Sequence, residues 1–227
     1  MFSIWPYVCG MALIRSAYQD ELDGVSQSLV DLTSMVTASI VKASKAVQTA
    51  DLALAEEVIA SDIKIDDYQH ELDARIIDII ARQQPVASDL RALVTAMRMS
   101  ADLERMGDLA HHIAKVARLR HPERAIPESL ILPFTEMGHV AEKLSIMVAT
   151  VITTRDTEMA MQVEKDDDEM DDLHKKVIAT IIKDETGLSL ESAIDLTLLG
   201  RYYERYADHA VSVARRVYFL VTGTFAN

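Results

Sequence analysis

Cysteine, glycine, proline and positive charge are all scarce in this sequence of 227 residues. The single cysteine, Cys9, excludes an intrachain disulfide, which is compatible with a reducing compartment. Because there are only 7 glycines and 5 prolines, and 49% of the residues are hydrophobic, the composition predicts a well-packed helical protein and not a disordered chain. The formal net charge of −13 repels nucleic-acid phosphates and anionic lipid headgroups, which argues against direct binding to either.

The sequence also lacks a convincing export or membrane segment. Its apolar start, MFSIWPYVCGMALI, has no basic residues before it and is interrupted by Pro6 and Gly10. A secretory signal begins with a basic region, and a membrane-spanning helix needs about 20 consecutive apolar residues. We therefore expect no span here or elsewhere. We treat residues 1–10 as an extra segment, with Met11 as an alternative start.

Hydrophobic periodicity predicts six helices, because apolar residues recur at spacings of three and four along most of the sequence. Asp51, Asp156 and Ser189 are the expected N-caps of the second, fifth and sixth helices. The six helices are expected at residues 13–48, 52–82, 83–118, 128–154, 157–187 and 190–221.

Two gap-free alignments indicate that the second half of the sequence repeats the first. Residues 51–72 match residues 156–177, and residues 102–118 match residues 202–218. The offset is 105 positions in the first alignment and 100 in the second, so the difference falls near the turn between the second and third helices. Such self-similarity is typical of a duplicated structural unit.

We therefore predict an all-α fold of two tandem three-helix bundles. The first bundle is expected at residues 11–120 and the second at residues 129–227. Residues 121–128 contain two prolines and form the clearest break, so they are the expected linker. Short connections within each half favour antiparallel neighbouring helices.

Both halves carry acidic residues spaced four positions apart, which places both carboxylates on the same face of a helix. Three of the four pairs lie on mostly apolar faces; Leu90, Leu93, Met97 and Ala101, for example, share the face of the pair near residue 104. The four pairs are Asp62 and Asp66, Glu104 and Asp108, Asp167 and Asp171, and Glu204 and Asp208.

The acidic pairs predict one metal site in each bundle. Buried carboxylates need a compensating positive partner, and adjacent antiparallel helices would bring two pairs together. Oxygen ligands suit Mg, Ca, Mn or Fe, and the scarcity of cysteine argues against zinc in a structural thiolate site. A divalent or trivalent ion is expected, with Fe, Zn, Mn and Mg as candidates.

The same residues allow less specific interpretations. The acids could be solvated surface, neutralised by Arg105 and Arg205, which directly follow the two glutamates. His111 and His174 each lie three residues after an aspartate and could be extra ligands or ordinary hydrogen-bonded histidines. Gly107 lies within an acidic turn, where glycine costs roughly 1 kcal/mol relative to alanine, so we expect another backbone or a ligand cluster to approach closely there.

Three segments together resemble the PhoU family of phosphate-signalling regulators: QQPVASDLR at 83–91, DLERMGDLAHHIAKVA at 102–117 and YYERYADHAVSVARR at 202–216. The resemblance extends over about residues 11–222 and agrees with the duplicated three-helix layout. It implies metal clusters on the acid-x-x-x-acid pairs, so the eight acidic residues named above are the implied ligands.

One departure from the family pattern concerns the second repeat. Tyr202 and Tyr203 stand where the first repeat has Asp102 and Leu103, and the face that precedes them is less apolar. We therefore expect the second site to bind metal more weakly or differently.

The resemblance implies a cytoplasmic negative regulator of the phosphate-starvation response. Its implied partners are the ATPase of the high-affinity phosphate ABC transporter and a sensor histidine kinase, with contact to the membrane only through them. A homodimer is also expected. Two alternatives stay open: a metal-dependent helical-bundle enzyme of the di-iron type, and a structural scaffold with surface acids. Against an enzyme, the sequence shows no glycine-rich phosphate loop and no Ser-His-Asp arrangement.

Overall fold

Six α-helices make up most of the chain in the computed structural model, which describes residues 5–183 and 187–224. No strand occurs within those two ranges, so the all-α prediction is confirmed. The helices are α1 (Trp5–Thr49), α2 (Leu52–Gln83), α3 (Ala87–Arg120), α4 (Glu128–Thr154), α5 (Thr157–Ile182) and α6 (Leu190–Thr222).

The three predicted N-caps are confirmed. The side chains of Asp51, Asp156 and Ser189 accept hydrogen bonds from backbone N–H groups of the first helical turn, at 3.0, 2.8 and 3.1 Å. Each cap satisfies donors that have no partner within the helix. The fifth helix was expected to end near Gly187; α5 ends at Ile182, and residues 184–186 lie outside the described ranges.

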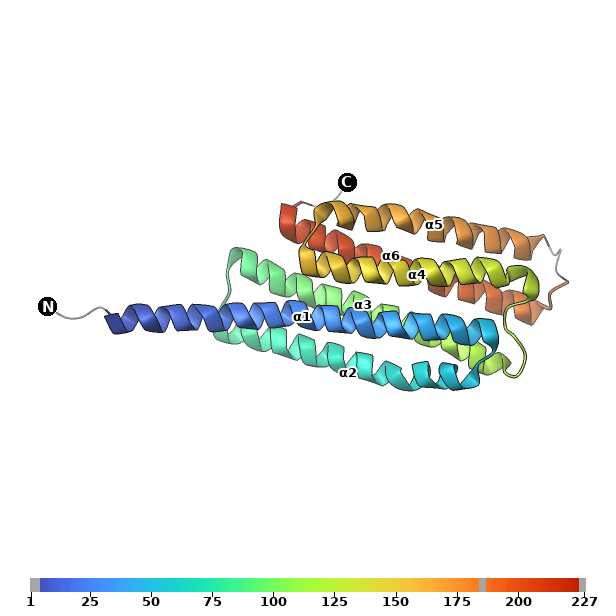
Figure 1. Cartoon of the computed structure of the whole chain (residues 1–227), viewed down its shortest axis with the longest axis horizontal. Helices are drawn as coiled ribbons and strands as arrows, with labels where there is room; N and C mark the ends of the chain where they lie inside the picture. The colour runs from blue at the N-terminus through green and yellow to red at the C-terminus, as the bar shows by residue number, and fades with distance from the viewer. Residues whose placement is uncertain (1–4, 184–186, 225–227) are drawn as a thin grey trace.

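The first helix starts earlier than the predicted residue 13. It begins at Trp5, so residues 5–10 continue α1, whose start projects beyond α2 and α3 (Figure 1). Pro6 was expected to interrupt this segment. It is compatible with the helix because it lies in the first turn, where a missing N–H costs no intrahelical hydrogen bond.

The helices pack in four layers (Figure 1). In the first half α2 packs against both α1 and α3, and in the second half α5 packs against both α4 and α6. The halves meet where α1 packs on α4 and α3 packs on α6. One apolar core therefore runs through both halves, as shown by the buried Tyr203, whose hydroxyl donates to Ser44 Oγ across the interface at 2.9 Å. That residues 11–120 and 129–227 form two separate three-helix units stays a prediction.

The connection between α3 and α4 is packed into this core. The predicted linker contains Ile126, whose exposed fraction is 0%, and Ala125, which is also buried. His121 Nδ1 lies 3.2 Å from the carbonyl oxygen of Ala50, at the turn between α1 and α2. The segment therefore closes one end of the interface between the two halves.

No helix within residues 5–183 and 187–224 combines the length and apolar character that crossing a membrane requires.

Candidate metal centre

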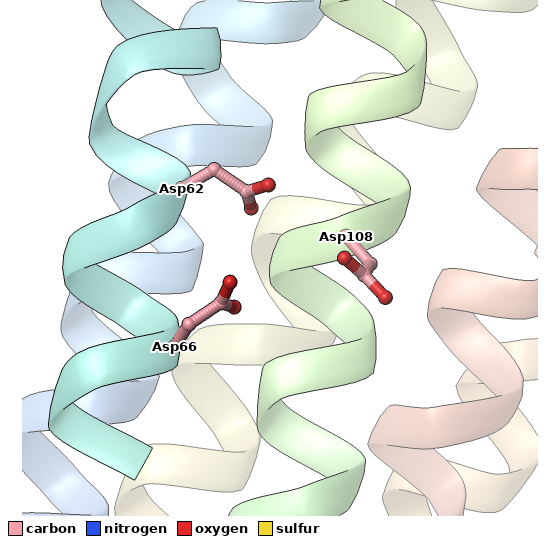
Figure 2. A group of neighbouring side chains, drawn as sticks. All are labelled: Asp62, Asp66 and Asp108. Carbon is pink, nitrogen blue, oxygen red and sulfur yellow. The ribbon is translucent and has the colours of Figure 1, made fainter. Parts of the chain in front are cut away.

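The first acidic cluster lies between α2 and α3. Asp62 and Asp66 leave successive turns of α2 toward α3, where Asp108 lies (Figure 2). One carboxylate oxygen from each of the three lies within 4.8 Å of the other two. Glu104 precedes Asp108 by one turn, and burial followed by the charge of Asp108 raises the pKa of Glu104. The structure thus brings three of the four acids predicted for the first bundle together, and the fourth, Glu104, interacts with them electrostatically from outside that group.

The three aspartates cannot all be charged there without cost. At 4.8 Å and an effective dielectric near 20, each charged pair repels by on the order of 3 kcal/mol. Burial, and then the charges of Asp62 and Asp108, accordingly raise the pKa of Asp66. A cation held between these carboxylates would attract each of them, and this attraction would outweigh their mutual repulsion.

Two buried oxygens indicate that these side chains suit a cation. Asp62 is only 9% exposed, and its Oδ1 has no hydrogen-bond partner among the described residues. Asp66 Oδ1 is also buried and has no partner there. Since a buried acceptor without a partner costs about 1–3 kcal/mol, a bound cation that met both oxygens would remove two such penalties.

The periodicity predicts that the acidic pair of α3 continues the buried apolar stripe. In the structure the pair lies at the border of that stripe instead. Leu90 is 39% exposed and Ala101 is also exposed, whereas Leu103 and Met106 are fully buried. The reason is that α3 packs against α1 and α6 as well as α2, so its buried stripe faces several neighbours. Glu104 is therefore half-buried at the border between α2 and α3.

His111 also reaches the first cluster. It lies on α3 one turn after Asp108, and its Nδ1 contacts Asp62 Oδ2. An imidazole nitrogen is a good ligand for Fe or Zn, whereas Mg and Mn favour carboxylate and water ligands. The residues whose oxygens converge closely enough to hold an ion here are Asp62, Asp66 and Asp108, with Glu104 and His111 beside them.

Arg105 behaves as the sequence suggested, whereas the neighbour of Gly107 differs from the expected one. Arg105 Nη1 lies 2.6 Å from Asp108 Oδ2, but the arginine side chain is well exposed and neutralises that acid only from the solvent side. A Cβ on Gly107 would lie 3.0 Å from Ile65 Cγ2. The close neighbour of this glycine is therefore the side chain of Ile65 on α2, and not another backbone or a ligand cluster as expected.

The second acidic cluster lies between α5 and α6. Burial, followed by the charges of Asp208 and Asp171, raises the pKa of Asp167 to about 7. Burial and Asp208 also raise the pKa of Glu204. The four predicted acids therefore interact electrostatically, as in the first cluster.

The second cluster is nevertheless more open than the first. Within the described ranges, the first cluster alone has three acidic side chains with oxygens within 4.8 Å of one another. Arg201 forms an ion pair with Glu204, and Lys175 Nζ lies 3.9 Å from Asp171 Oδ2. The sequence had suggested Arg205 as the neutralising residue, whereas Arg201, three residues before Glu204, takes that place because it lies on the same helical face.

A polar network between the clusters was missed from the sequence. Asp102 of α3 accepts hydrogen bonds from three residues of α6: His209 Nδ1 at 3.0 Å, Ser212 Oγ at 2.9 Å and Arg216 Nε at 2.8 Å. Burial alone would raise the pKa of Asp102, but these hydrogen bonds hold it below its ordinary value. The sequence held one signal of this unusual role of Asp102, because the equivalent position in the second repeat is Tyr202 and not an acid.

A family model supports the duplication seen in the helices. The model described as the PhoU domain matches this chain twice, at residues 29–117 and 134–217. Both matches include one acidic cluster.

Curated relatives cover nearly the whole chain. It is 43% identical to the phosphate-specific transport system accessory protein PhoU homolog 2 of Mycobacterium tuberculosis over 93% of this chain and 100% of that protein. It is 42% identical to PhoU homolog 1 of Mycobacterium leprae over 93% of this chain and 96% of that protein.

Solved structures agree with the fold. The phosphate transport system regulatory protein PhoU from Streptococcus pneumoniae superposes with a TM-score of 0.84 at 25% identity, covering 92% of this chain and 99% of that one. PhoU from Pseudomonas aeruginosa gives a TM-score of 0.83 at 26% identity, covering 91% and 100%.

Proposed function

This chain belongs to the PhoU family, and from that premise we propose that it is an accessory regulator of a phosphate transport system. The observation that carries the proposal is the relationship to curated accessory proteins over 93% of the chain, at 43% identity. The net charge of −13 supports an output through protein contacts, because such a surface disfavours direct binding to DNA.

The proposed regulator is cytoplasmic and represses the phosphate-starvation response when phosphate is plentiful. It contacts the ATPase of the phosphate ABC transporter and a sensor histidine kinase, and it acts as a homodimer. The helical faces and acidic surface favour docking on basic or apolar patches of these partners.

We further propose that both acidic clusters hold metal ions. The bound ion supplies positive charge that neutralises converging carboxylates. In the first cluster Asp62 and Asp66 then fix α2 to Asp108 of α3, and His111 orients Asp62 through its Nδ1 contact. In the second cluster Asp167, Asp171, Glu204 and Asp208 hold α5 to α6. By holding neighbouring helices in fixed register, the ions would preserve the shape of any partner-binding face that spans two helices.

Elemental analysis and a cellular reporter test this function. The double variant Asp108→Ala, Asp208→Ala is compared with Asp67→Ala, which removes an exposed acid on α2 next to the cluster. In cells that lack their own homologue, the double variant should lose metal and express a starvation-responsive reporter in phosphate-rich medium, whereas the control should repress it. Normal repression by a stable, metal-free double variant would contradict the role of the metal sites.

The alternative of a metal-dependent enzyme predicts a different result. A di-iron-type oxidase or a phosphohydrolase would show oxygen uptake or phosphate release when the purified protein is loaded with Fe or Mn. We expect that neither the oxygen uptake nor the phosphate release of the wild-type protein exceeds that of the double variant. Turnover that requires Asp108 would instead support the enzyme.

A further inference from the structure

An apolar groove opens at one end of the interface between the two halves. It has a volume of about 510 Å³ and is lined by α1, α3, α6 and the end of α4. Leu29 of α1, Leu93 of α3 and Val217 of α6 form part of its apolar lining, while Asp89 and Arg155 are charged residues of the lining. Ligand pockets of proteins usually have volumes of about 300–1,000 Å³, so this groove is large enough for a short peptide.

The internal duplication identifies an equivalent region at the opposite end of the interface. With the offset of 100 positions, the groove segment 88–99 of α3 corresponds to 188–199 of α6, and the groove segment 217–221 corresponds to 117–121. Arg155 corresponds to Ala50, since each directly precedes an aspartate N-cap and each has a positive φ, 57° and 54°. The two ends are therefore built from matching elements.

The opposite end is filled by the chain itself. The segment 121–127 crosses it, with His121 against the carbonyl oxygen of Ala50 and with Ile126 fully buried. Arg120 also pairs there with Glu191 at 2.8 Å and with Asp195. An aliphatic side chain within a short non-helical segment thus completes this end of the core.

At the groove, the described residues supply no equivalent of that segment. Leu220 stands in place of Arg120 and Thr95 in place of Asp195, so the ion pair is replaced by a more apolar surface. Asp89 accepts a hydrogen bond from Ser88 Oγ at 3.2 Å, and it forms no ion pair with any residue that the structure describes. The groove therefore offers an apolar floor with one acidic group, Asp89, that is not paired to a cation among the described residues, and one basic group, Arg155.

We propose that this groove binds a short non-helical segment of a partner protein, which inserts a branched aliphatic side chain as Ile126 does at the opposite end. A basic residue beside that side chain faces Asp89, in agreement with the net charge of −13. The inference rests on the proposed function as an adaptor, and it specifies where and by what chemistry a partner docks.

The probe is a fluorescein-labelled peptide with the chain's own linker sequence, HPERAIP, and the measurement is fluorescence anisotropy with the full-length protein. A second peptide carries aspartate in place of the isoleucine. We expect the first peptide to bind at least tenfold more tightly than the second. Equal binding of the two peptides, or none by either, would overturn the proposal.

Two variants locate the binding. Ala92→Trp places an indole in the groove, and Ala101→Trp places one on an exposed position of the same helix as the matched control. With both variants folded by circular dichroism, the first should weaken peptide binding at least tenfold and the second should leave it unchanged. Asp89→Asn should weaken binding several-fold at low salt, with the difference lost at high salt. Equal affinity of the two tryptophan variants would refute the site.

Two further measurements identify other occupants. If deletion of residues 225–227 increases peptide binding tenfold, the chain's own end occupies the groove and the proposal is wrong. If Ala92→Trp converts a dimer to a monomer in light scattering, a second copy occupies it and the proposal is also wrong. Peptide binding is measured with purified protein and does not depend on phosphate signalling. A failure to bind the peptide would therefore leave the metal and reporter tests of the proposed function unaffected.

Discussion

Replacing Asp167 by asparagine should stabilise the metal-free protein at high pH. Burial and the neighbouring acids raise the pKa of Asp167 from 3.8 to about 7, so the native state binds this proton more tightly than the unfolded chain does. The resulting destabilisation is absent below about pH 4, grows as the pH rises, and is complete above about pH 7. At 1.36 kcal/mol per pH unit its upper limit is about 4 kcal/mol.

The measured effect should be smaller than that limit, because Asp167 remains partly exposed and solvent screens its neighbours. We expect Asp167→Asn to raise the free energy of unfolding by about 1–2 kcal/mol at pH 8 and by much less at pH 4.5. The assay is urea unfolding of EDTA-treated protein, followed by circular dichroism at both pH values. The matched control is Asp168→Asn, which neutralises the adjacent exposed acid.

Two results would refute this reasoning. If Asp167→Asn is no more stable than the wild type at pH 8, burial and the neighbouring acids do not penalise the charged form of Asp167 as its raised pKa implies. If Asp168→Asn stabilises the protein equally, the effect is one of net charge and not of the cluster. Adding Mn²⁺ should stabilise the wild type more than Asp167→Asn, since the ion and the substitution remove the same repulsion.

Three further substitutions test the contacts around the sites. Tyr206→Phe removes a buried hydroxyl 2.7 Å from Ser145 Oγ, and should lower the free energy of unfolding by about 1–2 kcal/mol in urea titrations. Asp102→Asn weakens the charge-assisted bond from Arg216 across the halves, and should cost about 1.5–3 kcal/mol and make hydrogen exchange in α6 faster. Gly107→Val adds side-chain atoms against Ile65 of α2, which must give way, and should lower metal occupancy of the first cluster and cost about 1–3 kcal/mol. Unchanged occupancy by elemental analysis would contradict the close packing.

Most of the helical framework was predictable because its signals are local. The N-caps at Asp51, Asp156 and Ser189 depend on short-range hydrogen bonds, and they agree with the structure. The exceptions are the end of α5, at Ile182 instead of near Gly187, and the start of α1, where the sequence suggests that Pro6 interrupts the helix although the first helical turn accommodates proline.

The candidate site was predictable in its membership but not in its detail. The four-residue spacing of acids, repeated in both halves, placed Asp62, Asp66 and Asp108 in one cluster. The sequence marked His111 as a possible ligand or hydrogen-bonded residue but did not identify Asp62 as its contact, nor Arg201 instead of Arg205 as the partner of Glu204. Rotation along a helix and the crossing of neighbouring helices decide which side chains meet.

The sequence by itself determined six helices, their duplication and the acidic pairs, since each depends on spacing within one helix or on comparison of two segments. Only the tertiary structure decided how the two halves differ. The packing of α3 on α6 brings Asp102 to residues more than 100 positions away, and the segment 121–127 closes one end of the interface while the other end stays open as a groove. These differences arise from contacts between distant segments, which no periodicity within a helix can encode.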